Sequence, residues 1–571
     1  MAPSRSPRVL TELPAPGAAD ERDPGVGPLR WWSSAWRWAR RHPLVTVLVF
    51  GLVQAVVGAV WIWTNRRLGS FDPDEAGYLA TALRYQRSID PAHPMAFVRE
   101  VASTTNGPLV PILSLPFLIA GPRDPRAAML VQPLLAALTG VAAAGITRRL
   151  AGATAAVVVG LFVVALPTML LAAGSYWYGL GAAACMTGAL WALLASERLS
   201  NRWRWAFGLC CGLMLLARTM SLGFLPGLLL AGLVLAWGDR GRLLGWVEAV
   251  VVTGIVAGPW WIARREEIFD YLVGYAYGSR AALWGTGGPV ERLLDRALLV
   301  SWSSFLLPII PLAVVAVAWG ARTAMERRPW RPPWTDGVRA VAATAVVVVL
   351  GFVALVSTSN RGVWFELPLV VAMIPLGAAI VARGRPLPRR LLAAWMLGVA
   401  LIAPVAVRVA GIGHADGALV RYDERFTAGP TQQRRASDEW RALNEAVTAD
   451  LAELTDRGRN GSVWVTGNMF LLNTNSLTLT AELDGWSATL GVPDTLAGST
   501  ARAAQLTPQV GGVERILVVV RHDLELFTPD LRWRSFERQA LGTGWREVER
   551  FPLPVEGEVV VLRHQDALAA E

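Results

Sequence analysis

Apolar stretches of about 20 residues recur between residues 42 and 410, and these long hydrophobic segments limit the possible folds more than any other feature. As a helix, each stretch is long enough to cross the ~30 Å hydrocarbon core of a bilayer. Only 17% of the 571 residues are charged, against ~25% in a typical soluble domain. The sequence therefore predicts a polytopic α-helical membrane protein.

The hydropathy pattern predicts eleven spans, at residues 43–63, 127–147, 153–172, 177–196, 204–218, 221–237, 244–262, 297–319, 340–357, 365–382 and 391–410. The first follows an Arg-rich segment and lacks a small-residue cleavage site, which favours a retained span over a signal peptide. Residues 108–120 are too short to cross a bilayer and contain three prolines. They predict a re-entrant or interfacial segment beside the eleven spans.

The distribution of charge predicts the orientation in a plasma membrane. With the N-terminus in the cytoplasm, every inner end is basic, as the positive-inside rule requires: Arg148-Arg149, Arg198 to Arg204, Arg240-Arg242, Arg322 to Arg339, and Arg383 to Arg390. The net charge of +10 divides into +17 for residues 1–410 and −7 for residues 411–571. Arginines at span ends indicate contact with anionic membrane lipids and no role in binding nucleic acid.

Three regions follow from these patterns. Residues 1–42 are expected to be a disordered cytoplasmic N-terminus that ends in an interfacial anchor of Trp and Arg. Residues 43–410 form the transmembrane domain, with a long first outer loop at 64–126. Residues 411–571 predict a soluble extracytoplasmic α/β domain, whose first helix is expected at 437–456 with Ser437 as its cap. Strands are expected there at 462–466, 515–520 and 558–562.

The candidate chemistry lies in the first outer loop, where Asp-Pro-Asp-Glu-Ala-Gly-Tyr occupies positions 72–78. Such carboxylates can act as a general base, as metal ligands or as helix caps. Capping explains Asp72 and Glu75, because a helix that starts at Pro73 and runs to about Gln86 favours acids in its first turn. Asp74 is explained least by capping. It lies four residues before Tyr78 and thus on the same helix face, which suggests one pocket for both.

The apolar face of that helix carries Tyr78, Leu79, Ala82 and Leu83, and it is compatible with a position in the membrane plane. The three cysteines of the chain all lie in hydrophobic segments and indicate neither a disulfide framework nor a zinc site.

Four further stretches accompany the acidic motif in order along the chain. Asn-Gly-Pro-Leu lies at 106–109, Leu-Leu-Ala-Arg-Thr at 215–219 with Pro226 after it, Pro-Trp-Trp at 259–261, and a segment with Arg361 and Phe365 at 357–368. Together with Asp74, Glu75 and Tyr78, they resemble the motifs of a membrane glycosyltransferase family with the GT-C fold. This family comprises the protein O-mannosyltransferases and the bacterial lipid A aminoarabinose transferases. The resemblance covers residues 43–383.

The resemblance implies an enzyme that transfers a sugar, with inversion, from a polyprenyl-phosphate carrier to an acceptor on the outer face. The acceptor would be an envelope glycan, lipid or protein. Asp74 is then the base for the acceptor hydroxyl, and Glu75 orients the acceptor or a neighbouring loop. Arg218 and Arg361 are expected to bind the phosphate bidentately. Further candidates for substrate binding are Tyr78, Asn106, Arg280, Arg264 and Arg265.

The sequence departs from the family pattern at three places. Asn106 replaces a His, Trp364 replaces an Arg, and the second outer loop, Gly-Ser-Tyr-Trp-Tyr at 174–178, carries no carboxylate. No cofactor is indicated, although Asp72, Asp74 and Glu75 could together hold a divalent cation.

A transporter or flippase of a lipid-linked envelope precursor is the alternative function, because intramembrane arginines and a large outer loop would suit it as well. Transporters commonly show inverted repeats and acids in the middle of spans. The hydropathy shows no inverted repeat, and the only acid well inside an expected span is Glu248. A structural scaffold, the third class, would not require the Asp74-Glu75 pair.

Overall fold

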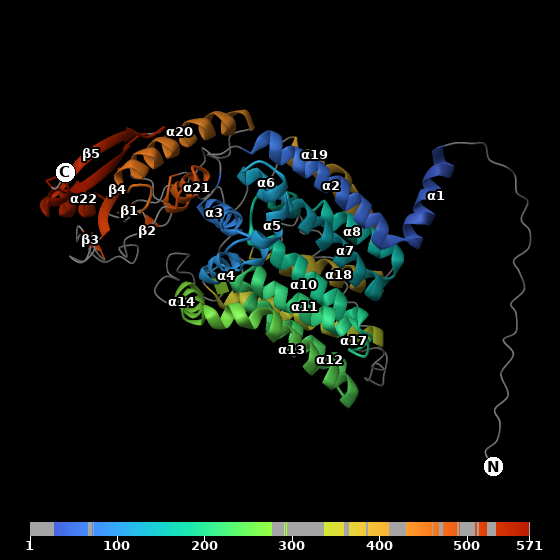
Figure 1. The fold of residues 1–571 in the computed structure, drawn as a ribbon. Coiled ribbons are helices and arrows are strands. Elements are labelled where there is room, and N and C mark those ends of the chain that lie inside the picture. Colours follow the sequence, from blue (N-terminus) through green and yellow to red (C-terminus); the bar gives the residue numbers. More distant parts are fainter. Residues whose placement is uncertain are drawn as a thin grey trace, which may run out of the picture.

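A computed structural model describes residues 28–66, 71, 73–104, 106–276, 290–291, 293, 336–358, 365–383, 386–409, 430–459, 461–466, 472–487, 490–491, 509–510, 513–521, 533–554 and 556–569. The chain folds into a helical bundle followed by a smaller domain that contains a β-sheet (Figure 1). Helix α1 (Pro28–Arg41) precedes the bundle and carries the Trp-rich segment predicted as an anchor.

Seven helical segments within the described residues are long and apolar enough to cross a membrane. They are α2 (Pro43–Asn65), α6 with α7 (Pro125–Met129 and Val131–Ala151), α10 (Tyr178–Ala195), η1 with α12 (Thr219–Phe224 and Leu225–Ala236), α13 (Arg240–Ala263), α17 (Asp336–Ser357) and α19 (Pro386–Arg408). An eighth is formed if α8 (Ala153–Val164) and α9 (Pro167–Ala173) count as one span bent by 49°. Pro167 lies at this bend, where its missing N–H and fixed φ interrupt the helical hydrogen bonds.

Each predicted span that the structure describes coincides with a helix. Two of these helices, α11 (Trp203–Ala217) and α18 (Leu367–Ala382), do not belong to the seven or eight segments above, because they are shorter than a full crossing of ~20 residues requires. The segment expected to be re-entrant forms α5 (Leu109–Ala120), which is likewise short. The span expected at 297–319 lies outside the described residues. Seven or eight crossings are therefore supported by length and composition within the described part.

Two buried apolar clusters hold the bundle together. One joins the first outer loop to α7, α8, α10 and α18, and the other joins α10, α11, α12, α13 and α17. Both clusters contain residues of α10 and α18, so these two helices connect the two halves of the bundle.

The first outer loop forms α3 (Pro73–Ser88), α4 (Pro94–Ser103) and α5. Helix α3 begins at Pro73 as predicted, but the position expected for its apolar face is wrong. Tyr78, Leu79, Ala82 and Leu83 are buried in protein, because α3 packs against α5 on one side and against α21 (Thr474–Leu483) on another. Contacts with protein rather than with the membrane plane therefore hold this helix.

The C-terminal domain contains a mixed six-stranded sheet in the order β2-β1-β4-β6-β5, with β3 paired to β4. The strands are β1 (Gly461–Thr466), β2 (Leu490–Gly491), β3 (Gln509–Val510), β4 (Val513–Arg521), β5 (Trp545–Pro552) and β6 (Glu558–His564). Strand β1 runs parallel to β2 and β4, whereas β6 runs antiparallel to β4 and β5. Helices α20 (Pro430–Leu454) and α21 cover one face, and α22 (Trp533–Gly542) covers the other.

The three strands predicted in this domain are confirmed as β1, β4 and β6. The predicted start of its first helix is wrong, because α20 begins at Pro430 and Ser437 lies inside the helix. Ser437 is a common capping residue, but a local motif does not stop a helix whose preceding residues can also adopt helical geometry. Helix α23 (Gln565–Leu568) follows the last strand.

Candidate active site

Asp74 and Glu75 occupy the first turn of α3 and face different surroundings. Successive residues of a helix point about 100° apart, so one can face a core while its neighbour faces outward. Glu75 is 1% exposed, whereas Asp74 is exposed. Only Asp74 is therefore accessible to a substrate hydroxyl.

The buried carboxylate of Glu75 joins two outer loops. Its Oε1 accepts a hydrogen bond from the backbone N–H of Tyr176 at 2.7 Å, and its Oε2 pairs with the guanidinium of Arg66 at the end of α2. The Tyr176 hydroxyl lies 2.7 Å from Oγ of Ser114 on α5. The second outer loop lacks a carboxylate of its own and is held by that of Glu75.

Tyr78, one turn after Asp74, lies in a buried aromatic cluster. Its ring stacks on Tyr178 with centroids 3.9 Å apart and meets Trp177 edge-on at 5.9 Å. The ring therefore anchors α3 to the start of α10. A contact between Tyr78 and a substrate stays a prediction.

Arg218 follows the last turn of α11, where its backbone is already extended. The residue is 8% exposed, and its guanidinium carbon lies 3.8 Å from the ring centroid of Phe365. Its Nη1 is buried and has no hydrogen-bond partner among the described residues. A buried guanidinium nitrogen without a partner is unfavourable, which makes Arg218 a candidate for binding an anion.

The charges of Arg218 and Asp74 act on each other. Desolvation raises the pKa of the Asp74 carboxyl, and the nearby positive charge of Arg218 partly offsets this by lowering it. Surrounding protein removes part of the hydration of the carboxylate and so disfavours its charged form, although one side of Asp74 stays open to solvent. A carboxyl of this kind is suited to accept a proton at a pH nearer to neutral.

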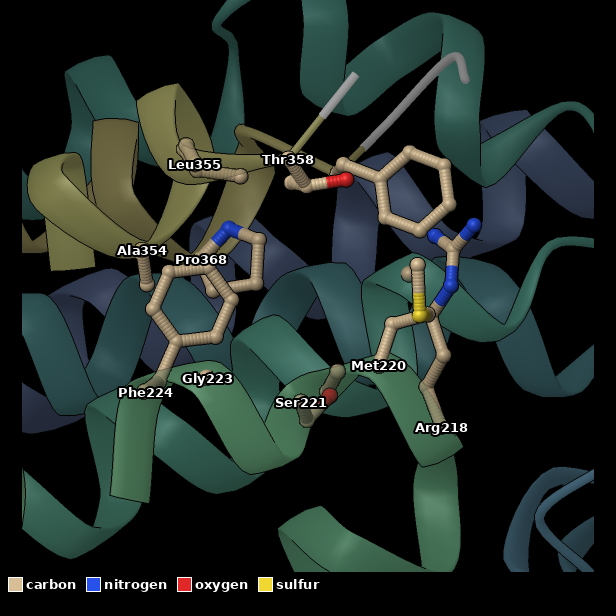
Figure 2. A pocket seen from close by; sticks show the side chains of 12 residues that line it. Arg218, Met220, Ser221, Gly223, Phe224, Ala354, Leu355, Thr358 and Pro368 are labelled. Carbon is tan, nitrogen blue, oxygen red and sulfur yellow. The ribbon is translucent and has the colours of Figure 1, made fainter. Parts of the chain in front are cut away.

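A pocket with about 470 Å³ of empty space, its open side included, lies next to Arg218. Figure 2 shows Arg218 on one side of the pocket and Phe224, Ala354 and Leu355 on the opposite side. The lining is otherwise mostly apolar and comes from α10, η1, α17 and α18: Gly179, Ala182, Met220, Ser221, Gly223, Thr358, Phe365 and Pro368. Among the described lining residues Arg218 is the one cation, and a cation beside apolar walls fits an amphiphile with an anionic group.

The motif around Asn106 packs directly against the motif that contains Arg218. A Cβ atom on Gly107 would lie 2.2 Å from the carbonyl oxygen of Leu216, so only glycine permits this approach. Asn106, half-buried in the bend before α5, is thereby placed close to the chain segment that ends at Arg218. Two motifs about 110 residues apart in the sequence thus adjoin in the fold.

Several predicted site residues do not contribute to this arrangement or lie outside the described part. Arg361, Arg280, Trp364 and Asp72 are outside the described residues. Arg264 pairs with Glu267 at 3.0 Å and Arg265 with Glu266 at 3.3 Å, so both are neutralised within α14 (Arg265–Ala276) or at its start.

A divalent cation held jointly by Asp72, Asp74 and Glu75 stays a prediction. Among the described residues, no group of three or more His, Cys, Asp or Glu side chains could hold a metal ion. Both carboxylate oxygens of Glu75 already contact Arg66 and the Tyr176 N–H.

Sequence reasoning missed Arg66 and the role of the Tyr176 backbone. Arg66 looks like any arginine at a span end, and a backbone N–H carries no sequence signal. The absence of an acid in the second outer loop was the one available hint, since a loop next to the site needs some other support.

Comparison with known proteins supports the fold. No protein-family model matches the sequence, and no curated protein matches it significantly. The structure is similar to that of ArnT from Cupriavidus metallidurans bound to undecaprenyl phosphate, with a TM-score of 0.51 at 15% identity, covering 90% of this chain and 97% of ArnT. It is similar to the apo structure of the same protein with a TM-score of 0.53 at 16% identity, and the coverage is the same. The chain is thus a multi-pass membrane protein with a GT-C-like fold, similar over most of its length to that of ArnT.

Proposed function

We propose that this protein is a glycosyltransferase that moves a sugar from a polyprenyl-phosphate donor to an envelope glycan, lipid or protein acceptor on the outer face of the plasma membrane. One observation supports this most: the buried Nη1 of Arg218 has no partner among the described residues, beside an apolar pocket and near Asp74. The similarity of the fold to ArnT, solved with undecaprenyl phosphate, favours the same class of donor.

In the proposed reaction Asp74 takes the proton from the acceptor hydroxyl. The hydroxyl oxygen attacks the anomeric carbon of the donor sugar, and the bond between this carbon and the phosphate oxygen breaks. The electron pair stays on the leaving polyprenyl phosphate, whose negative charge Arg218 stabilises. A single displacement of this kind inverts the configuration at the anomeric carbon.

The surroundings of the two groups suit these roles. Desolvation raises the pKa of Asp74 above its ordinary value, as suits a general base, while the positive charge of Arg218 acts in the opposite direction and lowers it. The Arg218 guanidinium is held over Phe365 and therefore needs little rearrangement to bind phosphate. Arg361 and Arg280 are proposed as additional phosphate ligands, and Tyr78 and Asn106 as contacts to the sugar or acceptor.

Glu75 has a different role in this proposal. Its carboxylate holds the second outer loop through the Tyr176 N–H, so it positions the loop rather than the acceptor. A substitution of Glu75 would then change the rate of transfer only by changing the position of α3 relative to α10.

The proposal is tested by following transfer from a radiolabelled polyprenyl-phosphate sugar in membranes that contain the wild-type protein or a variant. Asp74→Asn is expected to lower the rate at least about 100-fold, as for loss of a general base. Asp456→Asn, a change of an exposed acid in the C-terminal domain, serves as the matched control. An Asp74→Asn protein that is folded and fully active would show that Asp74 is not the base.

A second arm tests the donor site. Arg218→Gln is expected to raise the KM for the lipid-linked donor and to lower kcat, because the leaving phosphate loses its counter-charge. Unchanged dependence on donor concentration would refute the role of Arg218. Uptake or flipping of the intact donor without sugar transfer would instead support the transporter alternative.

A further inference from the structure

Helix α21 of the C-terminal domain lies along α3, the helix that carries Asp74 (Figure 1). Asn475 near the start of α21 meets Gly77, and Glu482 near its end meets Arg87. The two helices therefore run in the same direction, and the start of α21 lies beside the turn of α3 that follows Asp74.

An ion pair between buried Glu482 and partly exposed Arg87 secures the far end of this contact. The Glu482 side chain is 1% exposed, and its carboxylate lies 2.8 Å from Nη2 of Arg87. Arg87 also donates to the Ser487 hydroxyl, and Arg123 before α6 donates to the carbonyl oxygen of Glu482 at 2.8 Å. Two arginines of the first outer loop thus hold one segment of the C-terminal domain.

Apolar packing and one glycine complete the contact. Leu479 belongs to the same buried cluster as the apolar face of α3, although it lies in the C-terminal domain. A Cβ on Gly77 would lie 3.0 Å from Cγ of Asn475, so the glycine allows the close approach. Helix α3 is consequently held by the bundle on one side and by α21 on the other.

We propose that α21 is a positioning element of the active site, and that Glu482, through Arg87, is the positioning residue that keeps α3 and Asp74 in place. This inference rests on the proposed function of Asp74 as the base. In this proposal the C-terminal domain contributes to catalysis without touching the donor. No residue of α3 or α21 lines the pocket beside Arg218, where the donor phosphate is proposed to bind.

The first test separates kcat from KM in the full-length protein. Glu482→Gln removes the charge that holds Arg87, so one of the attachments that fix the position of α3 is weakened. A displacement of about 1 Å at a catalytic group can cost on the order of 100-fold in rate. We expect kcat to fall about 10- to 100-fold, while the KM for the lipid-linked donor stays unchanged. Glu445→Gln, an exposed acid of α20 that pairs with Arg441, is the matched control with unchanged kcat.

The second test restores the contact covalently. The two Cβ atoms of Gly77→Cys and Asn475→Cys cannot lie more than about 4.5 Å apart, since one C–C bond adds ~1.5 Å to the 3.0 Å contact. This separation permits a disulfide. The two cysteines are introduced with and without Glu482→Gln. After oxidation, kcat of the protein with Glu482→Gln is expected to lie within about threefold of kcat of the oxidised protein that retains Glu482. Reduction of the disulfide is expected to abolish this gain.

The outcomes distinguish the two proposals. If the wild-type protein transfers no sugar, the proposed function fails, while formation of the disulfide still reports whether α21 lies on α3. If transfer occurs and Glu482→Gln is fully active, Glu482 is not a positioning residue. If the oxidised pair inactivates an otherwise wild-type protein, α21 has to leave α3 during the reaction, and the proposal is overturned.

Discussion

At the scale of single residues, the site contains two neighbouring acids with opposite surroundings. Glu75 is buried and paired, and Asp74 is exposed with a pKa raised by desolvation. Surroundings that disfavour the charged form of a carboxyl lower the stability of the folded protein when that carboxyl is ionised. Active sites commonly contain such groups.

Asp74→Asn is expected to stabilise the protein at neutral pH while transfer is lost. The folded-state pKa of Asp74 lies above the unfolded value of ~3.9. Its contribution to stability is therefore fully present below the unfolded pKa and lost as the pH rises through the folded pKa. The Tm of the purified variant should exceed that of wild type at pH 7.5 and match it near pH 3.5. A lower Tm for the variant at pH 7.5 would contradict this sign.

The pH dependence of transfer should report the same carboxyl. At saturating donor, kcat is expected to fall as the pH drops, with a midpoint above the ordinary Asp value. Arg218 lowers the pKa of Asp74, so Arg218→Gln should move this midpoint to higher pH. Rates of wild type and variant measured between pH 4 and pH 9 check the direction. A midpoint that stays the same or moves down would show that the two charges do not interact.

At the scale of elements, the site depends on how closely the outer loops and the ends of helices adjoin. Glu75 joins α2, α3 and the loop before α10, and Gly107 joins the bend before α5 to the end of α11. These contacts connect segments that are distant in the sequence. Loss of either contact is expected to disturb the site without any change in Asp74 or Arg218.

Glu75→Gln is expected to destabilise the protein by about 3 kcal/mol, because it leaves the guanidinium of Arg66 unpaired in a mostly buried position. Equilibrium unfolding in mixed detergent micelles measures the change. In the Glu75→Gln background, Arg66→Gln should cost much less than it does alone, since both substitutions remove one ion pair. Additive losses would show that the pair contributes nothing.

Gly107→Ala is expected to cost about 1–3 kcal/mol, because the new methyl group would overlap the Leu216 carbonyl and force the backbone apart. Transfer should fall as well, since the displaced segment leads into Arg218. Gly254→Ala is the matched control, because a Cβ there has no atom of another described segment within 4 Å and alanine favours the helix. Equal effects of the two substitutions would argue against the tight contact.

At the scale of the whole molecule, the positions of the spans and the basic inner ends predict one orientation. The C-terminal domain would then lie outside, on the same side as Asp74, as the contact between α21 and α3 requires. A domain on the opposite side of the membrane could not touch the first outer loop.

Cysteine labelling in intact cells measures this orientation. A cysteine at exposed Glu445 on α20 should react with an impermeant maleimide from outside. A cysteine at exposed Ser34 on α1 should react only after the membrane is permeabilised. The native cysteines provide the background measurement, since Cys211 is buried and the other two lie in spans. The opposite pattern of labelling would reverse the predicted topology.

The sequence alone determined the membrane class of the fold, the places of the described spans, the three main strands of the C-terminal domain and the start of α3. These features depend on local hydrophobicity and on the capping residues, which act over a few positions in the chain. Local patterns could not give the start of α20 at Pro430, because a serine such as Ser437 occurs inside helices as well as at their N-terminal caps. Local patterns also could not show that α11 and α18 would be shorter than a full crossing.

The different tasks within the acidic motif follow from tertiary contacts. From the sequence, Asp74 and Glu75 were two carboxylates in one helical turn, and Tyr78 was a possible pocket partner. The fold buries Glu75 against Arg66 and Tyr176, stacks Tyr78 on Tyr178, and leaves Asp74 accessible near Arg218. The physical reason is that burial, desolvation and charge pairing depend on groups such as Tyr176 and Arg218, which lie more than 100 positions away in the sequence and whose approach the local sequence does not encode.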